Sequence, residues 1–228
     1  MNSADRFRDL QIVESWKRNA LPWTIAVRER HIESRRLITD KAMIDAIANC
    51  SPRLVLDVGC GEGWLVRILT GLNIEAVGVD VVPALIEAAT RAGDGDFRVM
   101  SYEDIAAGAL KLSVDLIACN FSLLGKESVE GLFLAARSLL GSRGSMIVQT
   151  LHPIIACGDR PYRDGWRDGS WAGISGDFSD PAPWYFRTLE SWSELFTASG
   201  FRLREIREPL HPETQKPISV IFIGEPAA

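Results

Sequence analysis

The stretch Val55-Leu56-Asp57-Val58-Gly59-Cys60-Gly61-Glu62-Gly63 decides the fold of this 228-residue chain. It begins as a short apolar run, which is typical of a buried strand, and turns abruptly into glycines. From residue 64 onward apolar side chains recur at helical spacing. In α/β proteins, a strand, a tight glycine turn and a helix in direct succession bring a helix N-terminus and bare backbone N–H groups up to a ligand. The stretch therefore predicts an α/β domain with a ligand site at this turn.

The spacing of the glycines restricts the ligand. They follow a G-x-G-x-G pattern, whereas a dinucleotide fingerprint needs G-x-G-x-x-G and would place a glycine where Trp64 stands. Asp57 lies at the strand end, and a fixed carboxylate there repels a pyrophosphate but attracts a ligand with an ammonium and a sulfonium. The stretch resembles the glycine motif of class I S-adenosylmethionine (SAM)-dependent methyltransferases of the small-molecule type. A tight turn in another α/β fold is the alternative.

The resemblance implies that SAM is the cofactor and that the turn binds it. The residues it assigns to cofactor binding in the turn are Asp57, Gly59, Cys60, Gly61 and Gly63.

Composition excludes several classes of protein. No apolar run reaches the roughly 18 residues that a membrane span needs, and the N-terminus lacks the apolar core of a signal peptide. We therefore expect a cytoplasmic protein without membrane contact. The net charge of −5 argues against nucleic-acid binding, which needs a basic face. The four cysteines show no zinc spacing, so no metal site is expected.

The order of elements predicts the architecture. Five strand candidates at residues 55–58, 75–80, 97–100, 114–120 and 145–150 are separated by helical segments, which indicates a doubly wound, mainly parallel sheet of Rossmann-like type. Two further strands, at 201–206 and 217–224, are joined without a helix and should be antiparallel. A last antiparallel strand completes the seven-stranded sheet that the resemblance implies. We expect a helical cap at residues 1–52 and a SAM-binding domain at residues 53–228.

The N-terminal segment is helical in pattern. A first helix is expected before residue 21 and a second over residues 34–50, with Leu37, Ile38, Ile44, Ile47 and Ala48 facing inward. Eight Lys and Arg against five Asp and Glu make residues 1–36 locally basic. This is either a solvated helical face or a cover over the cofactor cleft. The resemblance implies that a basic or aromatic side chain here meets the SAM carboxylate or closes over the substrate, and the candidates are Arg35, Arg36, Arg28 and Trp23.

Polar residues stand at the carboxyl ends of the other strands, where ligands of such sheets bind. Asp80 can accept hydrogen bonds from ribose hydroxyls or cap the following helix. The resemblance implies that Val81 packs on the adenine. It also implies that the loop containing Tyr102 contacts the adenine, with Glu103 or Asp104 accepting a hydrogen bond from its amine. Alternatively, these two acids cap the following helix. Asn120 and Phe121, at the end of the fourth strand, would hold the SAM amino group and flank the transfer path.

Residues 152–187 lack a helical or strand period, yet they contain seven aromatic residues. An irregular segment of this length in a compact domain is usually a functional lid or disordered, and the aromatics argue against disorder. We expect an insertion after the fifth strand that covers the substrate, with Trp166, Trp171, Trp184 and Tyr185 as binding residues. A structural excursion whose tryptophans pack on the core is the alternative.

These features predict SAM-dependent methyl transfer to a small-molecule acceptor by in-line attack on the methyl group. A general base is needed only if the nucleophile carries a proton; His152, at the end of the fifth strand, is the first candidate and His31 the second. A non-catalytic SAM-binding or regulatory protein and a nicotinamide-dependent oxidoreductase are the alternatives. We expect a monomer or a homodimer.

Overall fold

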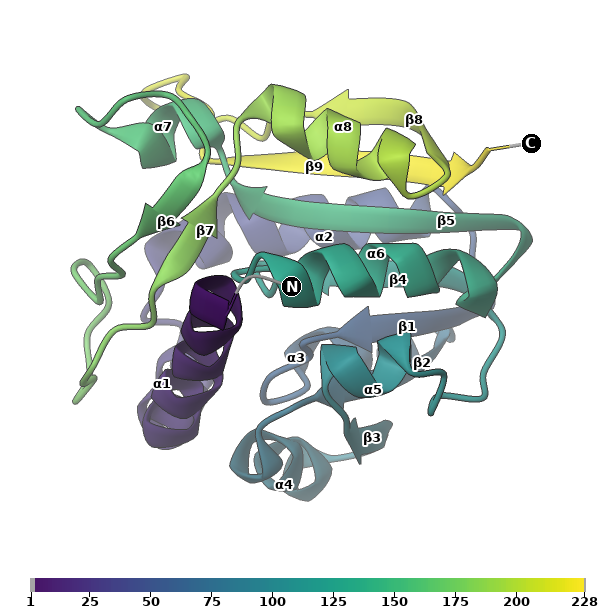
Figure 1. The fold of residues 1–228 in the computed structure, drawn as a ribbon. Coiled ribbons are helices and arrows are strands. Elements are labelled where there is room, and N and C mark those ends of the chain that lie inside the picture. The colour runs from purple at the N-terminus through teal and green to yellow at the C-terminus, as the bar shows by residue number, and fades with distance from the viewer. Residues whose placement is uncertain (1–2, 228) are drawn as a thin grey trace.

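The computed structural model describes residues 3–227 and contains a seven-stranded sheet with the strand order β3-β2-β1-β4-β5-β9-β8 (Figure 1). The strands are β1 (Leu54–Val58), β2 (Glu75–Asp80), β3 (Asp96–Val99), β4 (Val114–Asn120), β5 (Leu140–Leu151), β8 (Phe201–Arg207) and β9 (Ser219–Pro226). Strands β1 to β5 pair in parallel, and β9 is antiparallel to both of its neighbours. The predicted doubly wound sheet with an antiparallel last strand is confirmed.

Helices cover both faces of the sheet (Figure 1). On one face, α2 (Asp40–Ala48) and α3 (Trp64–Gly71) bury apolar side chains against the central strands. On the other, α5 (Tyr102–Ala106), α6 (Glu127–Leu139) and α8 (Leu189–Ala198) do the same, while α4 (Pro83–Ala92) follows β2. Since β1 pairs with β2 on one side and with β4 on the other, the strand order reverses at β1, and a crevice opens at the carboxyl ends of these strands.

The N-terminal segment differs from its prediction. Instead of ending before residue 21, the first helix is continuous as α1 (Ser3–Arg28), with Pro22 inside it. Its apolar positions Phe7 and Leu10 are exposed, and several of its buried positions, such as Asn19, are polar. Figure 1 shows α1 beside the ends of the parallel strands rather than on a face of the sheet. A helix in this place contacts loops and helix termini, whose backbone groups need polar partners, so its apolar spacing does not mark its buried face.

The second predicted helix begins with one turn of π-helix, η1 (Arg35–Thr39), which leads directly into α2. Ile47 is buried as expected, but Leu37 and Ala48 are exposed, contrary to expectation. The wider π turn changes the angle between successive side chains, so a spacing of 3.6 residues does not predict which of them face inward.

Strand β5 and the insertion after it also differ from the prediction. Strand β5 begins directly after α6 and runs through residues 141–144, where a loop was expected, with an irregular register against β4. The insertion contains short regular elements, α7 (Pro153–Cys157) and the antiparallel hairpin of β6 (Gly165–Arg167) and β7 (Trp184–Phe186). They were too short to show a period in the sequence. No helix in the described chain has the length and apolar character needed to cross a bilayer.

Candidate active site

The glycine turn after β1 is fixed by close approach of its neighbours. Gly59 has a φ of 76°, and a Cβ there would lie 2.3 Å from the Cβ of Ser122. Gly63 has a φ of 81°, and a Cβ there would lie 2.6 Å from the Phe97 ring. Any larger residue at these positions would both strain the backbone and push a neighbour away. The turn therefore presents bare backbone at the carboxyl end of β1.

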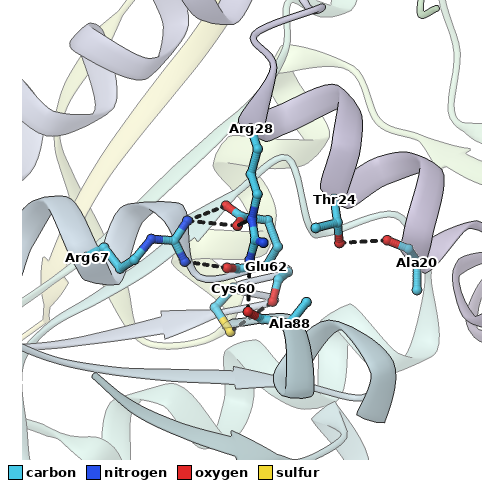
Figure 2. A network of polar contacts seen from close by, with 8 residues as sticks. Ala20, Thr24, Arg28, Cys60, Glu62, Arg67 and Ala88 are labelled. Carbon is cyan, nitrogen blue, oxygen red and sulfur yellow. Dashed lines mark hydrogen bonds and ion pairs between the residues drawn. The ribbon is translucent and has the colours of Figure 1, made fainter. Parts of the chain in front are cut away.

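Glu62, inside the turn, is a buried anchor that sequence reasoning missed. Figure 2 shows its carboxylate between two arginines: Nη2 of Arg67, from α3, lies 2.8 and 2.7 Å from its oxygens, and Nε of Arg28, at the end of α1, lies 2.8 Å from Oε2. Arg28 also donates to the carbonyl of Ala88 in α4 at 2.8 Å. These bonds join α1 to the turn and to two further helices. A charged residue within a glycine turn was the only sequence signal for this role.

Two carboxyl groups lie at the carboxyl ends of β1 and β2. Asp80 accepts hydrogen bonds from the backbone N–H of Gly61 at 3.0 Å and of Val82 at 2.9 Å, so it supports the turn and the start of α4. Burial raises the pKa of Asp80 to about 6 in spite of these bonds. Burial, and then repulsion by Asp80, raises the pKa of Asp57 to about 8. Ionisation of these two buried carboxyl groups is therefore unfavourable in the free protein, although Arg35 offsets part of the cost at Asp57.

Arg35 and Asn120 carry polar atoms that have no partner in the described part of the chain. The Arg35 guanidinium lies 4.7 Å from the centre of the Trp64 ring and 5.8 Å from that of Trp23, and its Nε donates to Asp40 at 2.9 Å. Its Nη2 is buried without a hydrogen-bond acceptor, and Oδ1 of Asn120 is buried without a donor. Both residues line a cavity of about 510 Å³ that reaches the glycine turn.

A smaller cavity of about 130 Å³ also reaches the turn and shares part of its lining with the larger one. Among the predicted cofactor residues, Asp80, Val81, Tyr102, Glu103, Asn120 and Phe121 line it. The Tyr102 hydroxyl donates to the Ser122 carbonyl at 3.0 Å. Asp104 forms a capping box with Ser101 at the start of α5, which leaves Glu103 as the acid that faces this cavity. Glu103 and Asp104 thus have different roles: Glu103 lines the cavity, and Asp104 caps the helix.

Aromatic residues form the wall of the larger cavity. Trp23, Trp171, Trp184 and Tyr185, four of the predicted substrate residues, line it together with Trp16, which the sequence did not single out. Trp16 packs edge-on against Trp23 at 5.0 Å and against Trp171 at 5.5 Å between ring centres. Trp166 does not line the cavity, because its indole N–H donates to Asp5 of α1 at 2.7 Å and joins the hairpin to the helix.

Phe121 links the two cavities. It lines both, and its backbone has a φ of 54°, a left-handed conformation that is uncommon for a bulky residue. Its N–H donates to the Gln149 carbonyl of β5 at 2.8 Å, which holds this conformation. Trp16, Trp23, Gly59, Gly61, Asn120 and Leu124 also line both cavities. A ligand in one cavity would therefore contact a ligand in the other among these shared residues.

The two histidines predicted as candidate bases, His152 and His31, do not line either cavity. The His152 side chain is buried outside the lining of either cavity, and its Nε2 lies 2.7 Å from Oε1 of Glu208. His31 lies on the exposed side of the cap beside Glu29. Cys60 lines the larger cavity, but burial and the Asp57 and Asp80 carboxylates raise its pKa well above the usual range. Neither histidine is placed to accept a proton in the cavity.

Comparison with known proteins agrees with this geometry. Residues 29–206 match the family described as a methyltransferase domain. The chain belongs to this methyltransferase family. The match confirms the predicted resemblance and removes the nicotinamide-dependent oxidoreductase as an alternative.

Curated relatives match part of the chain. A "Ubiquinone biosynthesis O-methyltransferase" from Xanthomonas oryzae pv. oryzae (strain PXO99A) is 32% identical over 103 residues, 43% of this chain and 43% of that protein. A protein of the same name from Cupriavidus pinatubonensis is 29% identical over 113 residues, 48% of this chain and 45% of that protein. The methyltransferase spans less than half the length of these relatives.

Solved structures share the fold. A SAM-dependent methyltransferase from Clostridium acetobutylicum superposes with a TM-score of 0.63 at 12% identity and covers 83% of this chain and 91% of that one. One from Mesorhizobium loti gives a TM-score of 0.57 at 20% identity, with 76% and 90% covered. The methyltransferase therefore has the class I fold that its glycine motif predicted.

Proposed function

We propose that this methyltransferase takes the methyl group of SAM and transfers it to a small molecule held in the aromatic cavity. The observation that carries this proposal is the pair of unpartnered buried atoms, Nη2 of Arg35 and Oδ1 of Asn120, on residues that line one cavity. A buried polar group without a partner costs free energy that a bound ligand can recover. The donor suits the carboxylate of the SAM methionine and the acceptor suits its ammonium, as the resemblance implied.

The adenosine part of SAM would occupy the smaller cavity. Asp80 and Glu103 offer carboxylate oxygens for ribose hydroxyls and an adenine amine, and Val81 offers an apolar surface for the ring. A cationic ligand beside the turn would stabilise the ionised forms of Asp57 and Asp80, which burial disfavours in the free protein. Asp57, Asp80 and Val81 come from the carboxyl ends of β1 and β2 or directly follow them, and Glu103 lies in α5, which follows β3.

SAM, when bound, supplies a methyl group that its sulfonium has already activated. The residues of this chain then have two tasks, which are to align an acceptor with that group and to exclude water. Phe121 and Asn120 lie where the two cavities meet, and Trp16 and Trp23 of α1 cover the same point. The larger cavity, at about 510 Å³, has room for an acceptor, which favours catalysis over a purely SAM-binding role.

The test is isothermal titration with S-adenosylhomocysteine (SAH), with NADH as the parallel ligand. Wild type should bind SAH in the micromolar range, and Arg35→Gln should weaken it about tenfold or more, because a charge-assisted hydrogen bond is lost. Arg36→Gln is the matched control, since the Arg36 guanidinium is exposed and lines neither cavity. Equal binding of SAH by the two variants would remove Arg35 from the cofactor site, and absence of SAH binding by wild type would overturn the proposal.

The expectations of a cytoplasmic location, of a monomer or homodimer and of no nucleic-acid partner stay predictions. Size-exclusion chromatography with light scattering tests the second of them.

A further inference from the structure

Arg187 is a buried arginine in the wall of the larger cavity. It follows β7 directly, and its side chain is only 3% exposed. Its guanidinium carbon lies 4.8 Å from the ring centre of Tyr185 and 5.1 Å from that of Trp192, and both rings line the same cavity. No motif or spacing in the sequence selects this arginine as a site residue.

The charge of Arg187 is poorly compensated by the protein. Nη1 donates to the carbonyl of Gly125 at 2.9 Å and Nη2 to that of Lys126 at 3.2 Å, so its close partners are neutral. The carboxylate of Glu130 lies 4.0 Å away and is about half exposed. Burial lowers the pKa of Arg187 in spite of the surrounding acids. Its one ion pair in the described chain is thus the long, half-exposed contact with Glu130, so an anion in the cavity would add compensation for a buried charge that the protein supplies only weakly.

Among the described residues that line the same cavity, none is a buried base for a protonated nucleophile. Among the described residues that line it, the ionisable side chains are those of Glu33, Arg35, Cys60, Tyr185 and Arg187. Burial raises the pKa of both Cys60 and Tyr185, so these groups keep their protons at neutral pH. Glu33 is 73% exposed and lies 3.8 Å from Arg36, on the cap rather than beside the aromatic wall. An acceptor that arrives already ionised would need none of them.

We propose that the acceptor of this methyltransferase is an organic acid of aromatic character, which enters the cavity as an anion and is held by Arg187. This inference rests on the proposed function and adds the chemical class of the acceptor. The aromatic wall selects a flat apolar body, and the buried guanidinium selects a carboxylate or phenolate oxygen. An anionic oxygen can form the new C–O bond while the C–S bond breaks and its electron pair stays on sulfur. No proton is transferred in that step.

The test measures binding of acid and amide pairs to the SAH-loaded protein by titration calorimetry. The probes are benzoate, 4-hydroxybenzoate, cinnamate and indole-3-acetate, each beside its neutral amide. At least one acid should bind wild type about tenfold more tightly than its amide, because the amide cannot form a charge-assisted bond with the guanidinium. Arg187→Gln should remove this preference, Arg187→Lys should restore part of it, and Arg163→Gln, an exposed arginine outside the cavity, should leave it unchanged.

The outcomes separate this inference from the proposed function. If SAH binds wild type but no acid is preferred over its amide, the acceptor class is wrong and the methyltransferase assignment stands. If SAH itself does not bind, the proposed function fails first. The comparison within wild type decides the matter even where Arg187→Gln does not fold. For an acid that binds, alkaline treatment of the product formed with SAM hydrolyses a methyl ester but not a methyl ether, so mass spectrometry after this treatment distinguishes a carboxylate from a phenolate nucleophile.

Discussion

At the scale of single residues, the two carboxyl groups at the ends of β1 and β2 are buried, and burial makes their ionisation unfavourable in the free protein. Asp57 is buried next to Asp80, and no hydrogen bond or ion pair to its carboxylate occurs in the described chain. Such a group keeps its proton in the folded state to a higher pH than in the unfolded state. The strain it causes when ionised is relieved by a cationic ligand, which is why we regard the pair as part of a binding site.

The first prediction concerns pH and stability. Asp57 has a folded pKa of about 8, against an unfolded value near 4, so between these values the folded state binds more protons and stability falls as pH rises. Asp57→Asn removes this contribution. The melting temperature of the variant relative to wild type should therefore rise steadily from pH 5 to pH 8.5 in thermal unfolding without ligand.

The exposed Asp94 provides the control, since Asp94→Asn should show no such trend. A difference between Asp57→Asn and wild type that is constant with pH would mean that the Asp57 carboxyl ionises normally in the folded protein.

At the scale of elements, helix α1 is joined at both ends to the units that build the site. Near its start, Asp9 accepts hydrogen bonds from the backbone N–H groups of Lys126 at 3.0 Å and Ser128 at 2.8 Å, so it caps α6 from outside. At its end, Arg28 binds Glu62 of the glycine turn, as Figure 2 shows. Two polar contacts thus hold the helix across the cofactor cavity.

The second prediction tests the connection at Glu62. Its side chain is fully buried, and Glu62→Gln would leave Arg28 and Arg67 without their common carboxylate. We expect a loss of about 2–4 kcal/mol in the free energy of unfolding, because removal of one partner from a buried ion pair leaves the other uncompensated. Urea denaturation followed by circular dichroism measures this loss.

Glu87→Gln, which breaks an exposed pair with Arg91, should cost less than about 1 kcal/mol in the same assay. Equal losses for the two variants would show that the Glu62 cluster is no stronger than a surface ion pair.

At the scale of the whole molecule, α1 and the insertion close the larger cavity together. The side-chain amide of Asn19 donates to the Ser179 carbonyl at 2.7 Å and accepts from the Ser179 N–H at 2.9 Å, and Arg18 pairs with Asp180 at 2.8 Å. Asn19 is fully buried at this contact. Helix α1 and the insertion, which both line the larger cavity, are therefore one connected unit.

The third prediction follows from that connection. SAH binding should slow hydrogen exchange both in α1 and in residues 170–182, because order in the helix is transmitted to the insertion through Asn19. Asn19→Ala should keep the effect in α1 and lose most of it in residues 170–182, as measured by mass spectrometry of peptic fragments. Asn73→Ala, on an exposed turn, is the control. Protection of the insertion that survives Asn19→Ala would contradict the proposed coupling.

Patterns along the chain predict the sheet and the glycine turn, which the structure confirms, and they place the candidate site at the strand ends. These depend on local signals, which are apolar runs of strand length, glycines whose φ is positive and polar residues at strand ends. Such signals act over a few residues and survive in any α/β context. Asp80, Tyr102, Asn120 and Phe121 were found in this way, and all four line the cavities.

Only the tertiary structure decided what the cap and the insertion contribute. Phe7 and Leu10 suggested a core face that α1 does not have, whereas Glu62 and Arg187 gained their roles from partners far away in the chain. His152 stands at a strand end like the true cavity residues, yet its ring turns toward Glu208. The direction of a side chain and the identity of a distant partner are set by packing between elements, which a pattern along the chain does not record.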